Sequence, residues 1–220
     1  MKFLVADDHP MFCDAISGIL ESSFENVEIV LAHSLDTLQE AVDANQKVDV
    51  ALLDLSMPGV YGFSGLSFLK GSYPETPIAI ISAREEPAVI NKAKAFGACG
   101  YIPKSASVEV LTEALAAVAK GEGWFPEGAA DGQVDEEDRL AVERLSEFST
   151  KQFKVFLLMA DGYSNQQIAD KLFMSISTAK GYVSATINAL ELTSRTQVAL
   201  VAKRLESKGA IDLKEHVASS

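Results

Sequence analysis

Several features are missing from this sequence, and each absence removes a class of protein. Among its 220 residues, no apolar run approaches the ~20 residues that a membrane-spanning helix needs. The first residues lack the long apolar stretch and small-residue cleavage site of a signal peptide. Only two cysteines occur, Cys13 and Cys99, too few for a disulfide framework or a four-ligand zinc site. We therefore expect a cytoplasmic protein with two buried free thiols and no membrane association.

Basic side chains are scarce and unevenly placed. The chain carries 19 Lys and Arg against 31 Asp and Glu, a formal net charge of −12. Because nucleic acids are bound mainly through Lys and Arg contacts to phosphate, this overall balance argues against DNA binding. Residues 144–220, however, carry 10 basic and 7 acidic side chains. This mildly basic third of the chain permits DNA binding without requiring it.

The first 120 residues alternate between two apolar patterns. Short runs of β-branched and aliphatic residues predict buried strands, and between them apolar residues recur at helical spacing. Five strands alternating with five helices predict an α/β domain, a doubly wound parallel sheet with helices on both faces. The expected strands are Phe3–Ala6, Val27–Ala32, Val48–Leu53, Ile78–Ser82 and Gly100–Ile102.

The rest of the chain has a different character. Residues 121–143 are rich in glycine and acid, which is typical of a linker, here leading into a short helix near Asp138–Glu147. Residues 149–208 contain no strand-like run and predict four helices. We therefore divide the chain into a first domain at 1–120, a linker at 121–143 and a small all-α domain at 144–213.

Helix starts in the C-terminal part are marked by repeated Ser-x-x-Gln pairs, each of which predicts a capping box. A further start is expected at Ser175 or Ser177. A short helix at Asn165–Leu172 and a longer one at about Ile176–Leu190 have the spacing of a helix-turn-helix. The pairs are Ser149/Gln152, Ser164/Gln167 and Ser194/Gln197.

Charged and hydroxyl side chains stand at the carboxyl ends of the expected strands. Asp7 and Asp8 follow the first strand and Asp54 follows the third, while Ser82 ends the fourth and Lys104 follows the fifth. Parallel α/β sheets bind ligands at this edge. Carboxylates gathered there repel one another unless a cation joins them, and hard oxygen ligands favour Mg²⁺. A hydroxyl and an ammonium at the rim suit the oxygens of a phosphoryl group.

These residues belong to segments that carry a family resemblance. The N-terminal part resembles the receiver domain of bacterial two-component response regulators, and the C-terminal part resembles the LuxR-type helix-turn-helix. Together they match the NarL/FixJ class of regulators. The segments are ADDHP at 6–10, DLSMPGVYG at 54–62, ISA at 81–83 and GYIPKS at 100–105, then residues 157–184 and SRTQ at 194–197.

The receiver resemblance implies a phosphoacceptor and a metal site. Asp54 is implied to accept a phosphoryl group from a sensor histidine kinase. It is also implied to bind Mg²⁺ together with Asp7, Asp8 and the backbone carbonyl of Ser56. Because phosphoryl transfer needs mainly positioning and charge neutralisation, this set of groups suits the chemistry.

The same resemblance implies a switch. Lys104 is implied to pair with one phosphoryl oxygen and Ser82 to hydrogen-bond another. Tyr101 stands at the position of a switch aromatic, which faces in or out according to where Ser82 lies. Phosphorylation is then expected to shift the surface of the fourth and fifth helices.

The helix-turn-helix resemblance implies binding to double-stranded DNA, with the second helix in the major groove. Lys180, Gly181 and Ser184 match base- or backbone-contacting positions. Thr178, Arg195 and Thr196 are expected to reach phosphate. The residues expected to form only the core are Ile168, Leu172, Ile176, Val183, Ile187 and Leu190.

The chain departs from the family pattern in this second helix. Ala179, Tyr182 and Ala189 stand where the family has Val, His and Lys, so fewer basic side chains line the expected DNA face. A single module should therefore bind weakly, and a homodimer on two half-sites would compensate. The resemblance implies a dimer surface on the last helix, although the same apolar residues also suit packing within one domain. They are Val198, Leu200, Val201 and Leu205.

The leading interpretation is a DNA-binding transcription regulator without enzymatic activity, for which RNA polymerase is a further possible partner. A phosphatase with an Asp nucleophile needs a second Asp two residues later, where this chain has Ser56. A nucleotide hydrolase is disfavoured because no Walker-type glycine-rich loop with Lys occurs. One alternative stays open, in which the divergent helix-turn-helix binds a protein partner instead of DNA.

Overall fold

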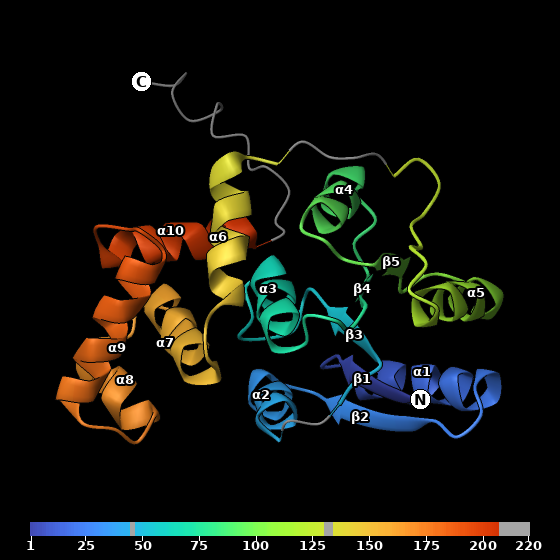
Figure 1. Cartoon of the computed structure of the whole chain (residues 1–220), viewed down its shortest axis with the longest axis horizontal. Helices are drawn as coiled ribbons and strands as arrows, with labels where there is room; N and C mark the ends of the chain where they lie inside the picture. The colour runs from blue at the N-terminus through green and yellow to red at the C-terminus, as the bar shows by residue number, and fades with distance from the viewer. Residues whose placement is uncertain (45–46, 130–133, 207–220) are drawn as a thin grey trace, which may run out of the picture.

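Figure 1 shows the computed structural model of the protein, which describes residues 1–44, 47–129 and 134–206. Five parallel strands form one sheet in the order β2-β1-β3-β4-β5, which confirms the predicted doubly wound sheet. No helix in these three ranges is long and apolar enough to cross a membrane. The strands are β1 (Lys2–Ala6), β2 (Glu28–Ala32), β3 (Val50–Asp54), β4 (Ile78–Ser82) and β5 (Gly100–Pro103).

Helices cover both faces of the sheet because successive side chains of each strand point to opposite sides. Phe3 and Val5 of β1 pack with α1 and α5 on one face. Leu4 and Ala6 pack with α2, α3 and α4 on the other. Figure 1 shows these two layers on either side of the strands. The helices are α1 (Pro10–Ser23), α2 (Leu35–Asp43), α3 (Phe63–Ser72), α4 (Pro87–Ala95) and α5 (Val108–Ala119).

The register of the central strands determines which polar residues meet. β1 pairs in parallel with β3, and Ala6 lies opposite Leu53. Asp7 follows Ala6, and Asp54 follows Leu53. Both carboxylates therefore lie at the same point of the sheet edge.

Serine side chains cap the last four of the five C-terminal helices, as the sequence predicts. Ser164 and Ser194 form full capping boxes with the glutamines three residues later. Ser149 accepts only the bond from the Gln152 N–H, so that pair is a single cap and not the predicted box. Ser175 caps the fourth helix of this part by accepting from Thr178 N–H. The helices are α6 (Glu136–Ser146), α7 (Thr150–Ala160), α8 (Asn165–Lys171), α9 (Ile176–Ala189) and α10 (Arg195–Leu205).

The two halves of the chain share one apolar core, because α6 and α7 pack against α3 (Figure 1). The rings of Phe68 on α3 and Phe153 on α7 stack with centroids 4.5 Å apart. The Ser67 hydroxyl donates a hydrogen bond to the carbonyl of Val142 on α6. At Gly71 the backbones approach so closely that a Cβ atom would overlap the Ser146 carbonyl oxygen. Small residues on α3 therefore allow α6 to lie directly on it.

A buried carboxylate ties α4 to the C-terminal helices. Asp138 on α6 lies 2.8 Å from Lys92 Nζ on α4 and 3.0 Å from Arg204 Nε on α10. Lys92 also donates to the Arg204 carbonyl oxygen at 3.0 Å. Because a buried charge is costly unless it is paired, these two cations offset the cost of burying the Asp138 carboxylate in the interface.

Both cysteines are free, as predicted, but only one is buried. Cys13 lies in the core under α1, and Cys99 is half-buried. Burial, with the nearby Asp7 carboxylate, raises the pKa of the Cys13 thiol to about 11. Burial also raises the pKa of the Cys99 thiol, so burial disfavours the nucleophilic thiolate at both cysteines.

Replacing Gly71 by alanine tests the close contact between α3 and α6. The added methyl group meets the Ser146 backbone, which cannot move without shifting α6, so we expect a loss of about 1–3 kcal/mol in the free energy of unfolding. Gly18→Ala on α1 is the matched control, because a Cβ there meets nothing within 4 Å. Urea unfolding of both variants measures the difference, and equal stability of the two would contradict this packing.

Candidate functional site

An acidic pocket lies at the carboxyl edge of the sheet, where the sequence places it. Asp7 and Asp54 are both buried at the ends of β1 and β3. Lys104, from the loop after β5, reaches between them, with Nζ 2.7 Å from Asp7 Oδ2 and 3.0 Å from Asp54 Oδ2. One ammonium group therefore neutralises part of the charge of two carboxylates.

The pocket includes a histidine that the sequence analysis did not single out. Ligand atoms of Asp7, Asp8, His9 and Asp54 all lie within 4.8 Å of one another. His9 Nδ1 lies 3.0 Å from Asp7 Oδ1 and 3.0 Å from Asp8 Oδ1, and the His9 N–H donates to Asp7 Oδ1 at 2.9 Å. Its position directly after the two aspartates is the signal that could have identified it.

The composition of this cluster suits a hard cation. Three of its four members offer carboxylate oxygens, which Mg²⁺ prefers. The buried Oδ1 atom of Asp8 faces the cluster, with the His9 ring nitrogen 3.0 Å away. The Ser56 N–H donates to Asp54 Oδ1 at 3.1 Å. Coordination by the Ser56 carbonyl stays a prediction.

Burial and Lys104 act against each other on the pKa of Asp54. Burial raises this pKa, while the hydrogen bonds from Lys104 and from the Ser56 N–H lower it, and burial prevails. For Lys104, burial alone would lower the pKa of the ammonium, but its bonds to Asp7 and Asp54 raise it. The pocket thus holds a desolvated carboxylate beside an ammonium group whose charged form these two carboxylates stabilise.

Ser82 and Tyr101 are linked through the start of the β4–α4 loop. The buried Ser82 hydroxyl accepts from the Arg84 N–H at 3.3 Å. Tyr101 is fully buried, and its hydroxyl donates to the Arg84 carbonyl oxygen at 2.7 Å. Burial raises the pKa of Tyr101 to about 12, so the phenol remains protonated. In this structure the predicted switch aromatic faces inward, and it holds the segment that leads into α4.

The second predicted site lies on α9. Thr178, Lys180, Gly181 and Ser184 are all exposed, whereas Ala179 and the other inward positions of the helix are buried. The four expected contact residues therefore share one open face. The receiver-like half packs on α6, α7 and α10 and leaves this face uncovered (Figure 1).

Two residues of this region, Arg195 and Ile176, have surroundings that the sequence did not predict. Arg195 is half-buried, with Nη1 donating to Asn165 Oδ1 at 3.2 Å and Nη2 donating to the Tyr163 carbonyl. Burial also lowers the pKa of its guanidinium. Arg195 thus holds the start of α8, while Thr196 is exposed. Ile176, expected in the core, is 43% exposed, because the first residue of α9 precedes the turns that pack inward.

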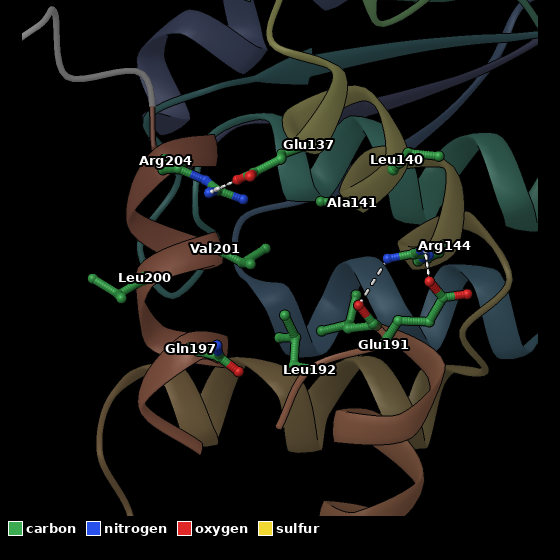
Figure 2. A pocket seen from close by; sticks show the side chains of 11 residues that line it. Glu137, Leu140, Ala141, Arg144, Glu191, Leu192, Gln197, Leu200, Val201 and Arg204 are labelled. Atoms are coloured by element: carbon green, nitrogen blue, oxygen red, sulfur yellow. Dashed lines mark hydrogen bonds and ion pairs between the residues drawn. The ribbon is translucent and has the colours of Figure 1, made fainter. Parts of the chain in front are cut away.

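The last helix, α10, uses most of its apolar residues within the chain. Val198, Val201 and Leu205 are buried, and only Leu200 is exposed among the four residues of the implied dimer surface. Beside it lies a cleft of about 460 Å³ between α6 and α10 (Figure 2). Its apolar walls are flanked by two ion pairs, Arg204 with Glu137 and Arg144 with Glu191.

Two family descriptions match the chain. Residues 3–116 match the response regulator receiver domain, and residues 146–202 match the LuxR family of bacterial regulatory proteins. The first of these alone covers more than half of the chain.

Individual proteins match over nearly the whole length. The glycerol metabolism activator of Pseudomonas putida is 33% identical over 208 residues, which cover 91% of this chain and 94% of that protein. The oxygen regulatory protein NreC of Staphylococcus aureus is 32% identical, with 94% and 100% covered. RcsB from Salmonella enterica, solved bound to promoter DNA with a phosphomimetic, is similar at a TM-score of 0.51 and 26% identity, with 92% and 98% covered. RcsB has also been solved as two dimers bound to two parallel DNAs, with a TM-score of 0.52, 27% identity, and 93% and 97% covered.

The internal bonds of Arg195 lead to a stability prediction. In an Arg195→Ala variant, the Tyr163 carbonyl and Asn165 lose their donor, and we expect about 1–3 kcal/mol less stability. The neighbouring Thr196→Ala change is the control and should stay within about 0.5 kcal/mol, because that side chain is exposed. Thermal unfolding distinguishes the two variants. An Arg195→Ala protein as stable as wild type would contradict a structural role for these hydrogen bonds.

Proposed function

Because the chain belongs to the bacterial response regulators that join a receiver domain to a LuxR-type DNA-binding domain, we propose that phosphorylation of Asp54 controls its binding to DNA. The observation that carries this proposal is the distance of 3.0 Å between Lys104 Nζ and Asp54 Oδ2 in a buried acidic pocket. A cation so close to a desolvated carboxylate reduces the repulsion between this nucleophile and a negatively charged phosphoryl donor.

In the proposed reaction, an Asp54 carboxylate oxygen attacks the phosphorus atom presented by a sensor histidine kinase. The bond from phosphorus to the kinase's histidine breaks, and an acyl phosphate forms on Asp54. Lys104 neutralises charge on the transferred group, and the Ser82 hydroxyl turns from the Arg84 N–H toward one of its oxygens. Asp7 is left to share Lys104 with the new anion.

Asp7, Asp8 and Asp54 are the residues that would hold Mg²⁺, with the Ser56 carbonyl as a further ligand. A bound Mg²⁺ supplies the positive charge that offsets the repulsion between carboxylates and phosphoryl oxygens. The grouping of ligand atoms from these aspartates and His9 within 4.8 Å of one another supports this assignment.

We propose that the signal leaves the pocket through α4. Movement of Ser82 disturbs the bond to the Arg84 N–H, and Arg84 also carries the carbonyl that holds Tyr101. The segment leads directly into α4, whose Lys92 is bonded to Asp138 on α6 and to the Arg204 carbonyl on α10. A shift of α4 would therefore displace groups on α6 and α10, the two helices to which Lys92 is bonded.

The exposed face of α9 is the proposed DNA-reading surface, with Lys180 as its basic side chain. Because this face is uncovered in the present arrangement, phosphorylation need not expose it. We propose instead that phosphorylation favours a homodimer, which places two copies of α9 on two half-sites. The RcsB dimers bound to DNA support this arrangement. A protein that reads chromosomal DNA would act in the cytoplasm.

The role of Asp54 is tested by phosphorylation with acetyl phosphate and Mg²⁺. We expect Asp54→Asn to abolish incorporation, because the amide is not a nucleophile for phosphorus. Asp14→Asn removes an exposed carboxylate on α1 and should leave labelling unchanged. Intact-protein mass spectrometry measures the added phosphoryl group. Persistent labelling of the Asp54→Asn protein would refute this site.

The role of α9 is tested with Lys180→Ala. Losing the basic side chain of the proposed DNA face should weaken binding more than tenfold, about 1.4 kcal/mol. Lys203→Ala is a matched control, since it removes the same charge from an exposed position on α10. Fluorescence anisotropy with duplexes selected from a random library by the phosphorylated protein gives both affinities. If the phosphorylated wild type selects no duplex but captures a protein, the alternative of a protein-binding domain would replace this proposal.

A further inference from the structure

The turn between α8 and α9 presents an aromatic ring to solvent. Phe173 is 96% exposed, although its two neighbours Leu172 and Met174 are half-buried and pack against the core. Those neighbours anchor the turn, because their N–H groups donate to Ile168 and Ala169 carbonyls at 3.0 Å. The Phe173 ring is therefore carried outward by a turn that is itself well held.

This position carries two costs at once. Phe173 has a φ of +50°, in the left-handed region that bulky residues rarely adopt. Its ring also stays in water, where it loses the gain of burial that an aromatic side chain offers. Glycine or asparagine would avoid both costs at this turn, since both tolerate positive φ and neither is apolar. None of the described residues covers the Phe173 ring, and its exposure points to a contact with another molecule.

A second apolar side chain stands beside this one, on the proposed DNA-reading helix. Ile176 is the first residue of α9 and is 43% exposed. In a helix-turn-helix, the N-terminal residues of the second helix contact the edges of the bases. Phe173 and Ile176 thus lie at the end of α9 that would enter the groove, and both are exposed, as Thr178 and Lys180 are.

We propose that Phe173 and Ile176 form an apolar lip that packs against thymine methyl groups at the edge of the major groove. The thymine methyl is the one apolar group that bases present there, and phenylalanine and other apolar side chains are its natural contacts. The lip makes the protein prefer thymine at the contacted positions. It also supplies affinity that does not depend on phosphate, which suits a helix whose face carries few basic residues. This inference rests on the proposed role of α9.

Phe173→Asn tests the lip, because asparagine is polar and accepts the left-handed backbone. The full-length phosphorylated variant should unfold at the same or a higher temperature than wild type and bind a library-selected duplex about fivefold more weakly or worse. The slope of log affinity against log salt should stay unchanged, because an apolar contact releases no counter-ions. Phe173→Tyr retains the ring and should retain most of the affinity, and Val108→Asn, on an exposed apolar residue of α5, serves as the control.

The DNA side is tested with the same duplex in which uracil, which lacks the methyl group, replaces thymine. Wild type should lose affinity with uracil at the contacted positions, and Phe173→Asn should not respond to the replacement. Equal binding by Phe173→Asn and wild type, or a clear loss of thermal stability in the variant, would overturn the lip. If Lys180→Ala weakens binding while Phe173→Asn does not, the lip fails and the DNA-reading role of α9 stands. If neither change affects binding, the assignment of α9 itself fails.

Discussion

The ion pair of Lys104 with Asp7 and Asp54 is the interaction on which the rest of the molecule depends. The parallel register of β1 and β3 brings two carboxylates to one point, and burial there raises the pKa of Asp54. The single ammonium keeps the pocket charged, and it is shared by both acids at 2.7 and 3.0 Å. A phosphoryl group on Asp54 would place more negative charge beside Lys104. The ion pairs of Lys104 with the two carboxylates would then have to change.

The way in which the two halves are joined gives such a change a path. Small residues on α3 admit α6 at close range, and the stacked Phe68 and Phe153 rings make the contact part of the core. At the edge of this interface, Asp138 is bonded to Lys92 of α4 and to Arg204 of α10. The segment that holds Tyr101 leads into α4, so the phosphorylation pocket and the DNA-binding helices are connected through bonded groups. The face of α9 that carries Thr178, Lys180, Gly181 and Ser184 points outward.

The outward face of α9 carries little of the positive charge that favours DNA binding. The chain is acidic overall, and the face of α9 relies on Lys180 among its exposed contact residues. Arg195, which also carries positive charge, is committed to bonds with Tyr163 and Asn165. Phosphate attraction is therefore modest for one copy of the domain, and binding would draw on dimerisation and on apolar contact.

The sequence by itself determined the strand and helix order, the helix starts and the polar residues of the pocket. Strand alternation and serine caps are local patterns, and parallel strands carry their end residues to one edge, so Asp7, Asp54 and Lys104 could be grouped without coordinates. Only the tertiary structure decided that His9 joins them, that Arg195 turns inward and that Asp138 bridges three helices. The spacing of apolar residues predicts one apolar face for each helix. Ser67 and Gly71 are not part of such a pattern, and they form the contact of α3 with α6 because they are small. Contacts between side chains far apart in the chain depend on how close two backbones come, and no local pattern of residues encodes that distance.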